Sequence, residues 1–147
     1  MWAFEHSVET TASPATVWGL YADVAGWPRW NAAVQSVKLD GPFQAGTSGW
    51  LTPPGAEPLP FTILAASEGT GYVSETTIAE TVRLRATNTL SQLPGGGCRI
   101  LHRAELVGPA AEYFGQSFGP ALRDGVPRTA EALAAHAAAV AADEAAA

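Results

Sequence analysis

SPATVWGLYADVAGWPRWN, residues 13–31, contains the start of one short helix, a second possible helix and three of the five tryptophans of the chain. Ser13 followed by Pro14 is typical of a helix N-cap with proline at the first helical position. Apolar residues recur behind them at helical spacing: Val17, Leu20, Tyr21 and Val24. We expect Gly26 to end this helix and residues 27–30 to begin a second, very short one.

The residues before this segment alternate in polarity. Trp2, Phe4 and Val8 fall on one face, whereas Glu5, Ser7 and Glu9 fall on the other. A period of two residues predicts a half-buried β-strand over Trp2–Thr10.

The residues after it are dominated by strand and turn signals. Turn-forming sequences such as residues 53–55 (PPG) and 94–97 (PGGG) separate short apolar runs. The short, regular spacing favours an antiparallel meander. The predicted strands are Val34–Asp40, Thr47–Thr52, Leu59–Ala66, Thr70–Ile78, Val82–Gln92 and Cys98–Val107.

The last third of the chain is rich in alanine and helical in pattern. Phe114, Phe118, Leu122 and Val126 repeat every fourth residue and so form one stripe. We expect Pro127 to bend or interrupt this helix. The helix is the one predicted element long enough to cover the sheet, and a curved sheet around a single helix favours an apolar ligand pocket between them.

Composition limits the possible partners. The 147 residues suit one domain, 1–147, and the net charge of −6 with only eight Lys and Arg argues against binding to nucleic acid or to an anionic membrane. No apolar run is long enough for stable membrane insertion. The single cysteine, Cys98, and the lack of a signal-peptide pattern at the first residues lead us to expect a cytoplasmic protein.

The opening strand, residues 12–18 (ASPATVW), residues 27–31 (WPRWN), Gly46, Gly97 and the long terminal helix together resemble the START-like, or helix-grip (SRPBCC), superfamily. Within it the chain is most similar to the polyketide cyclase/dehydrase and lipid-transport branch. The resemblance implies an α+β helix-grip fold: a curved seven-stranded antiparallel sheet wrapped around a long C-terminal helix, with two short helices between strands 1 and 2. It also implies an apolar cavity between sheet and helix.

The resemblance suggests a role for the clustered tryptophans. We expect Trp18 to pack into the core, and Trp27 and Trp30 to support the corner between the first two strands and to form a wall of the cavity. The alternative is that Trp27 and Trp30 also only fill the core.

Three strands each carry one polar residue on an otherwise apolar face: His6, Asn88 and His102. If residues 93–97 form a hairpin loop, Leu90 faces Ile100 and Asn88 faces His102. The first and last strands are neighbours in the helix-grip fold, which would bring His6 towards His102, in a register that the sequence leaves open. Tyr72 and Ser74 would extend the same polar patch.

This polar patch has two interpretations. The residues could satisfy one another's hydrogen bonds in the core and fix the strand register. Alternatively, they face the cavity, where His6 or His102 is a candidate general acid or base on an enolisable carbonyl and Asn88 orients a ligand oxygen. The predicted ligand-binding residues are His6, Trp27, Trp30, Tyr72, Asn88, His102, Phe118 and Leu122.

Other motifs carry little weight. Residues 115–119 (GQSFG) match the G-x-S-x-G of hydrolases but lie within a helical stripe, so we interpret the match as accidental. The histidines and Cys98 lack metal-ligand spacing, and we expect neither a metal nor a cofactor.

We therefore favour binding of a hydrophobic small molecule, such as an aromatic polyketide, lipid or isoprenoid, in the internal cavity. A polyketide cyclase or dehydratase that uses the cavity histidines is the alternative, because a held poly-keto chain needs few proton-transfer groups. A protein–protein or chaperone-regulator role is a second alternative. The sequence leaves open the ligand, the cavity size and whether the chain is a monomer or a homodimer.

Overall fold

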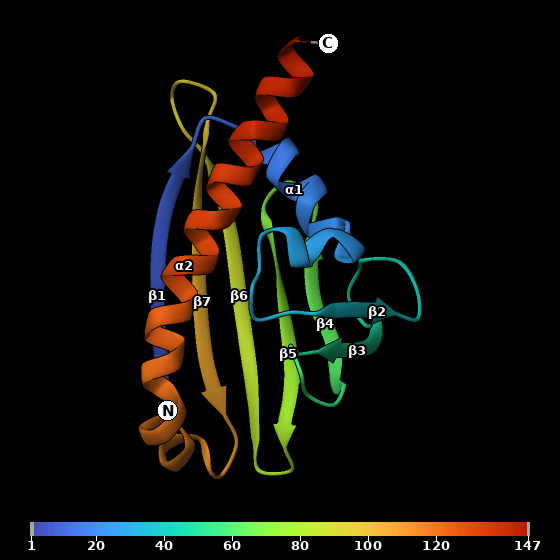
Figure 1. Ribbon diagram of the computed structural model, residues 1–147, viewed down its shortest axis with the longest axis vertical. Coiled ribbons are helices and arrows are strands. Elements are labelled where there is room, and N and C mark those ends of the chain that lie inside the picture. The colour runs from blue at the N-terminus through green and yellow to red at the C-terminus, as the bar shows by residue number, and fades with distance from the viewer. Residues whose placement is uncertain (1, 147) are drawn as a thin grey trace.

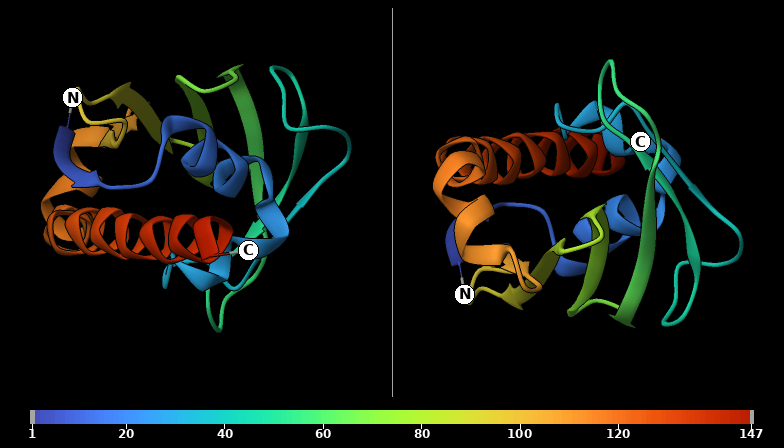
Figure 2. Two further views of the ribbon diagram at one scale, coloured as in Figure 1. Left: turned by 90° about the horizontal axis from the view of Figure 1, so that it is seen from above. Right: turned by 90° about the horizontal axis from the view of Figure 1, so that it is seen from below.

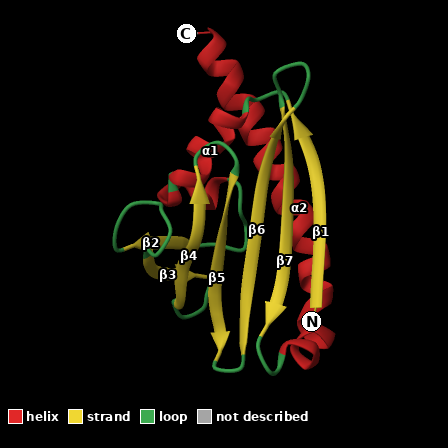
Figure 3. Cartoon of the chain, turned by 180° about the vertical axis from the view of Figure 1, so that it is seen from behind, coloured by secondary structure: helices red, strands yellow, loops and turns green. Residues whose placement is uncertain are grey.

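The computed structural model describes residues 2–146 and contains one seven-stranded antiparallel sheet with the order β1-β7-β6-β5-β4-β3-β2 (Figure 1, Figure 3). Consecutive strands from β2 to β7 are neighbours, and β1 adds to the far edge against β7. The strands are β1 (Trp2–Thr10), β2 (Ser36–Leu39), β3 (Ser48–Thr52), β4 (Leu59–Ser67), β5 (Gly71–Ala79), β6 (Val82–Gln92) and β7 (Cys98–Val107).

Three helices complete the fold: α1 (Pro14–Ala22), the 3₁₀ helix η1 (Val24–Arg29) and α2 (Ala111–Ala146). The long helix α2 lies along β1 and β7 on the concave side of the sheet, while α1 and η1 close one end (Figure 1, Figure 2). The predicted helix-grip α+β fold is therefore confirmed. In the part of the chain that the structure describes, no helix is long and apolar enough to cross a membrane.

The first helix is shorter than predicted. Ser13 is its N-cap as expected, with its side chain accepting a hydrogen bond from the Thr16 N–H at 3.2 Å. However, α1 ends at Ala22, where the backbone N–H of Asp23 bonds to the Gly19 carbonyl, and Gly26 lies inside η1 rather than ending α1. The helical spacing of Val24 misled the prediction, because a 3₁₀ turn continues the apolar pattern with different backbone bonds.

Pro127 does not interrupt the long helix, since α2 runs without a break through both Pro120 and Pro127; a bend at Pro127, the other expected outcome, stays a prediction. Each proline removes one backbone hydrogen bond, to the carbonyl four residues earlier. Those carbonyls belong to Gln116 and Arg123, which are exposed residues, so water can replace the missing donor. The second strand is also shorter than predicted, because β2 includes only Ser36–Leu39 of the expected Val34–Asp40.

The inner face of the sheet holds two separate hydrophobic clusters. The larger contains five buried aromatic rings, which we call the aromatic cluster: Tyr21, Trp27, Trp30, Phe61 and Tyr72. The smaller, which we call the helix-start cluster, has Val82, Leu106 and Ala111 at its centre, with several partly exposed apolar side chains packed on them: Trp2, Ile78, Leu84, Phe114 and Leu122.

Candidate functional site

Four of the predicted polar residues form one row across four strands. His6 on β1 is directly opposite His102 on β7, His102 is opposite Asn88 on β6, and Asn88 is opposite Tyr72 on β5. Directly opposed residues of an antiparallel pair share a face of the sheet. The expected pairing of Asn88 with His102 is present, and the register of His6, which the sequence left open, places it at the end of the same row.

Two hydrogen bonds provide partners for most of the polar side chains of this row. The Asn88 amide nitrogen donates to the Tyr72 hydroxyl at 2.9 Å, and the Tyr21 hydroxyl lies 2.8 Å from His102 Nε2. Tyr21 comes from α1 and is fully buried. Sequence reasoning placed Tyr21 only in an apolar stripe; the available signal was its hydroxyl, since a buried tyrosine needs a hydrogen-bond partner.

Burial keeps His102, Tyr21 and Tyr72 neutral. Burial, with a smaller contribution from the nearby His6, lowers the pKa of His102 from its ordinary 6.5 to about 4. Burial raises the pKa of Tyr21 and of Tyr72 above the ordinary value of a phenol, and the Asn88 hydrogen bond offsets part of the rise at Tyr72. At neutral pH the pair is therefore a phenol and an uncharged imidazole.

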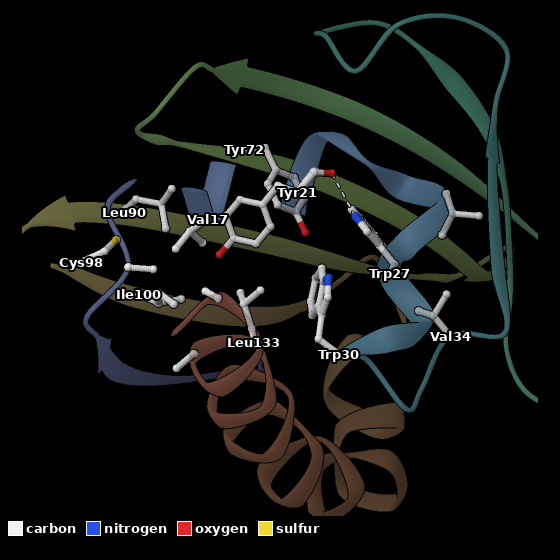
Figure 4. Packing of buried hydrophobic residues seen from close by; sticks show 14 of the residues in the cluster. Val17, Tyr21, Trp27, Trp30, Val34, Tyr72, Leu90, Cys98, Ile100 and Leu133 are labelled. Carbon is white, nitrogen blue, oxygen red and sulfur yellow. Dashed lines mark hydrogen bonds between the residues drawn. The ribbon is translucent and has the colours of Figure 1, made fainter. Parts of the chain in front are cut away.

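The aromatic cluster closes this part of the interior (Figure 4). Trp27 and Trp30 retain only 3% and 4% of their exposure, and the Trp27 indole N–H donates to the Tyr21 carbonyl at 2.9 Å. The ring centroids of Tyr21 and Tyr72 are 4.9 Å apart. Trp18, which we expected in the core, packs against the core cluster but is only partly buried, and its ring centroid lies 5.6 Å from that of Phe43 in an edge-to-face arrangement.

His6 has a different environment from His102. Its side chain is 34% exposed, and its Nε2 lies 3.9 Å from a carboxylate oxygen of Glu131 on α2. The two histidines are thus opposite one another in the sheet, but only His102 is enclosed.

Phe118 and Leu122 lie apart from the polar row. Leu122 packs on the helix-start cluster, and the Phe118 ring lies 5.3 Å from that of Phe114 and is tilted relative to it. Both keep partial exposure. The structure therefore brings together Trp27, Trp30, Tyr72, Asn88 and His102, and places the two helix residues beside a different cluster.

Two hollows lie on the surface near the start of α2. One has a volume of about 510 Å³ and is lined by Trp2, Glu112, Gly115, Gln116, Pro120 and Arg123. The other, of about 450 Å³, runs from Leu106 to Glu112. None of the predicted ligand-binding residues lines either hollow. Trp27, expected in the cavity wall, packs on the rings of Trp30, Phe61 and Tyr72, and the wall itself stays a prediction.

A row of small side chains follows the polar row along the sheet. Ala104 on β7, Ala86 on β6 and Ser74 on β5 are directly opposite one another. The next row places Thr76 opposite Leu84. Ser74 and Thr76 retain only 4% and 8% exposure, yet within residues 2–146 neither hydroxyl has a hydrogen-bond partner.

The arginines of the strands lie on the opposite, convex face, as expected from their alternation. Arg83 and Arg85 both pair with Glu75, at 3.2 and 2.6 Å, and Arg103 pairs with Glu105 and Glu5. These ions are remote from the inner face and belong to the solvated outside of the sheet.

Three solved structures are similar to the chain over most of its length. The aromatase/cyclase ZhuI from Streptomyces sp. R1128 has 16% identity and a TM-score of 0.73 over 92% of this chain and 93% of that one. A hypothetical protein, jhp0584, from Helicobacter pylori has 14% identity and a TM-score of 0.74 over 92% and 86%. A norcoclaurine synthase point mutant from Thalictrum flavum has 15% identity and a TM-score of 0.66 over 92% and 93%. At these identities the likeness concerns the fold alone.

Among functionally curated proteins, none matches the sequence. The family model described as polyketide cyclase / dehydrase and lipid transport matches residues 1–142, nearly the whole chain. The match agrees with the seven-stranded sheet, the helix pair after β1 and the long final helix. The chain belongs to the polyketide cyclase / dehydrase and lipid transport family.

Proposed function

We propose that the protein binds a hydrophobic small molecule between the inner face of the sheet and the stripe of α2 that carries Phe118 and Leu122. One observation carries the proposal: apolar side chains that face the interior here remain partly exposed. Leu84 of the sheet and Leu122 of the helix both pack on the helix-start cluster without being buried by it. A ligand that covered them would remove apolar surface from water, which is the main source of affinity in such sites.

The aromatic cluster has a supporting role in this proposal. Trp27, Trp30 and Tyr72 are close-packed and form the rigid inner end of the site rather than its open wall. The family membership agrees with the proposal, since its description includes lipid transport.

The enzyme alternative has less support. A general acid or base must reach the proton that it moves. His102 is 6% exposed and already bonded to Tyr21, and His6, which is more accessible, lies opposite His102 with its Nε2 3.9 Å from Glu131. The partner-protein alternative would use exposed apolar residues, and the large ones, Trp50, Leu64 and Tyr113, are divided between two strands and the helix α2.

The test is mass spectrometry of compounds that the purified protein retains after incubation with pools of aromatic polyketides, sterols, isoprenoids and fatty acids. We expect a compound to be retained unaltered. A compound returned cyclised or dehydrated would replace this proposal with the enzyme alternative, and a protein that retains nothing from any pool would refute it.

A matched pair of variants locates the site. Leu122→Gln places an amide on the proposed apolar wall, and we expect affinity for the retained compound to fall roughly tenfold, as for the loss of one buried leucine. Ala121→Gln makes the corresponding change at the neighbouring, exposed helix position and should leave affinity unchanged. Equal effects of the two variants would place the ligand elsewhere.

A further inference from the structure

We infer that the ligand carries a neutral oxygen, a carbonyl or a hydroxyl, and that the hydroxyls of Ser74 and Thr76 bind it. This inference rests on the proposed function and specifies the chemical class of its ligand. It depends on the position of the two residues, on their unused hydrogen bonds and on the small side chains beside them.

The two hydroxyls belong to the inner face of the sheet. On β5, Tyr72, Ser74 and Thr76 are buried, whereas Glu75 between them points outward to Arg83 and Arg85. Ser74 is directly opposite Ala86, and Thr76 is directly opposite Leu84, one of the partly exposed residues of the proposed site. The hydroxyls therefore lie between the aromatic cluster and the open apolar surface.

Their hydrogen-bonding capacity is unused within the fold. No fully buried side-chain nitrogen or oxygen in the described part of the chain lacks a hydrogen-bond partner. Because the Ser74 and Thr76 hydroxyls have no partner among these residues, each must touch space that a water molecule can enter. A hydroxyl at such a place can bond to water in the ligand-free protein, and a ligand oxygen can replace that water.

The neighbouring residues leave room for that oxygen. Ala86 and Ala104 continue the row of Ser74 across β6 and β7, so three adjacent positions on the inner face carry short side chains. The next row, towards the helix-start cluster, has the larger Leu84 and Leu106. An apolar ligand lying on Leu84 and Leu122 could thus extend its polar end over the alanines to Ser74.

The chemistry of the two hydroxyls selects the ligand class. A hydroxyl both donates and accepts hydrogen bonds, so the pair can bind either a carbonyl or another hydroxyl. A neutral oxygen is favoured because two uncharged hydroxyls stabilise a buried carboxylate much less than a cation would. We therefore expect oxygenated ring compounds to bind better than plain hydrocarbon groups of the same shape.

The test is a double comparison of ligand and protein. The probes are 2-acetylnaphthalene and 2-isopropylnaphthalene, which have nearly the same shape but differ in the carbonyl, and their dissociation constants are measured by equilibrium dialysis. We expect Ser74→Ala and Thr76→Val each to weaken ketone binding about fivefold, the effect of one hydrogen bond, and to leave hydrocarbon binding unchanged. The controls are Ser91→Ala and Thr77→Val. Ser91 is an exposed strand residue, and Thr77 is the outward neighbour of Thr76.

A thermal-unfolding measurement on the ligand-free variants separates binding from folding. Because the two hydroxyls lack partners among residues 2–146, Ser74→Ala and Thr76→Val should unfold at the same temperature as the parent protein or higher. Lower unfolding temperatures in both would mean that the fold itself uses the hydroxyls, which would overturn the inference.

The binding results distinguish this inference from the proposed function. If both probes bind and neither variant discriminates between them, the oxygen site is wrong while hydrophobic binding stands. If neither probe binds the parent protein, hydrophobic binding fails, and the oxygen site fails with it.

Discussion

The hydroxyl of Tyr21 and the Nε2 atom of His102 are 2.8 Å apart although 81 residues separate them in the chain. The bond joins α1 to the centre of β7, so it holds the short helices against the sheet. It also occupies one of the two ring nitrogens through which His102 could transfer a proton. The same contact therefore stabilises the closed end of the fold and weighs against His102 as a catalytic base.

Tyr21→Phe should destabilise the protein without changing its fold. The substitution removes only the hydroxyl and leaves His102 Nε2 buried without its partner, which typically costs about 1–3 kcal/mol. Urea unfolding followed by circular dichroism measures the loss. Tyr113→Phe is the control, because Tyr113 is 78% exposed, and it should leave the free energy of unfolding unchanged. Equal stability of the two variants would contradict the importance of this bond.

Stability should fall on acidification because of His102. The unfolded chain protonates this histidine near pH 6.5, whereas the folded protein does so only near pH 4. Between these values the unfolded state binds the additional proton, so the free energy of unfolding decreases as the pH falls. The total loss from this one group is about 3 kcal/mol, and above the upper value it contributes no pH dependence.

Urea unfolding at a series of pH values tests this directly. His102→Gln removes the titrating group. The free energy of unfolding should then depend less steeply on pH between the two pKa values, by the amount that corresponds to about one bound proton. Ala135→Gln, at an exposed position of α2 that carries no titrating group, should keep the slope of the parent protein. A His102→Gln variant as acid-sensitive as the parent would show that other groups cause the effect.

Much of the sheet could be predicted from the sequence because its signals are local. The hairpin loop at residues 93–97 determines the pairing of β6 with β7, and the predicted opposition of Leu90 with Ile100 and of Asn88 with His102 is present. The register of His6 could not be derived, since no tight turn connects β1 to β7.

The packing of the interior could not be predicted in the same way. Whether Trp27 and Trp30 line a cavity or fill it depends on how closely η1 approaches β4 and β5, as their ring contacts with Phe61 and Tyr72 show. Tyr21 was missed as a member of the polar row for the same reason, because its partner lies on a distant strand. Side-chain volume and helix placement decide these contacts, and local patterns report neither.

Two glycines of α2 allow the helix to lie close to β1. A Cβ atom at Gly115 would be 2.8 Å from Trp2 Cδ1, and one at Gly119 would be 2.7 Å from Trp2 Nε1. Gly115→Ala should therefore destabilise the protein by about 1–3 kcal/mol, the usual effect of overpacking. Gly125→Ala is a control in the same helix: nothing lies within 4 Å of its Cβ position, so it should stabilise the helix by roughly 0.5–1 kcal/mol. Chemical denaturation should show changes of opposite sign in the free energy of unfolding of the two variants. A stabilising Gly115→Ala would refute the close approach of α2 to β1.

Trp27→Phe should test whether the closed end of the interior is as tightly packed as the ring contacts indicate. The substitution removes the indole N–H that bonds to the Tyr21 carbonyl and leaves unfilled volume beside Phe61 and Tyr72. We expect a loss of about 1–3 kcal/mol in the free energy of unfolding. Trp50→Phe, at a residue that is 50% exposed, should change it by less than about 0.5 kcal/mol. If the two variants are equally stable, the side chains of the aromatic cluster rearrange at little cost in free energy. The ligand site would then extend past Ser74 into the region that the cluster occupies.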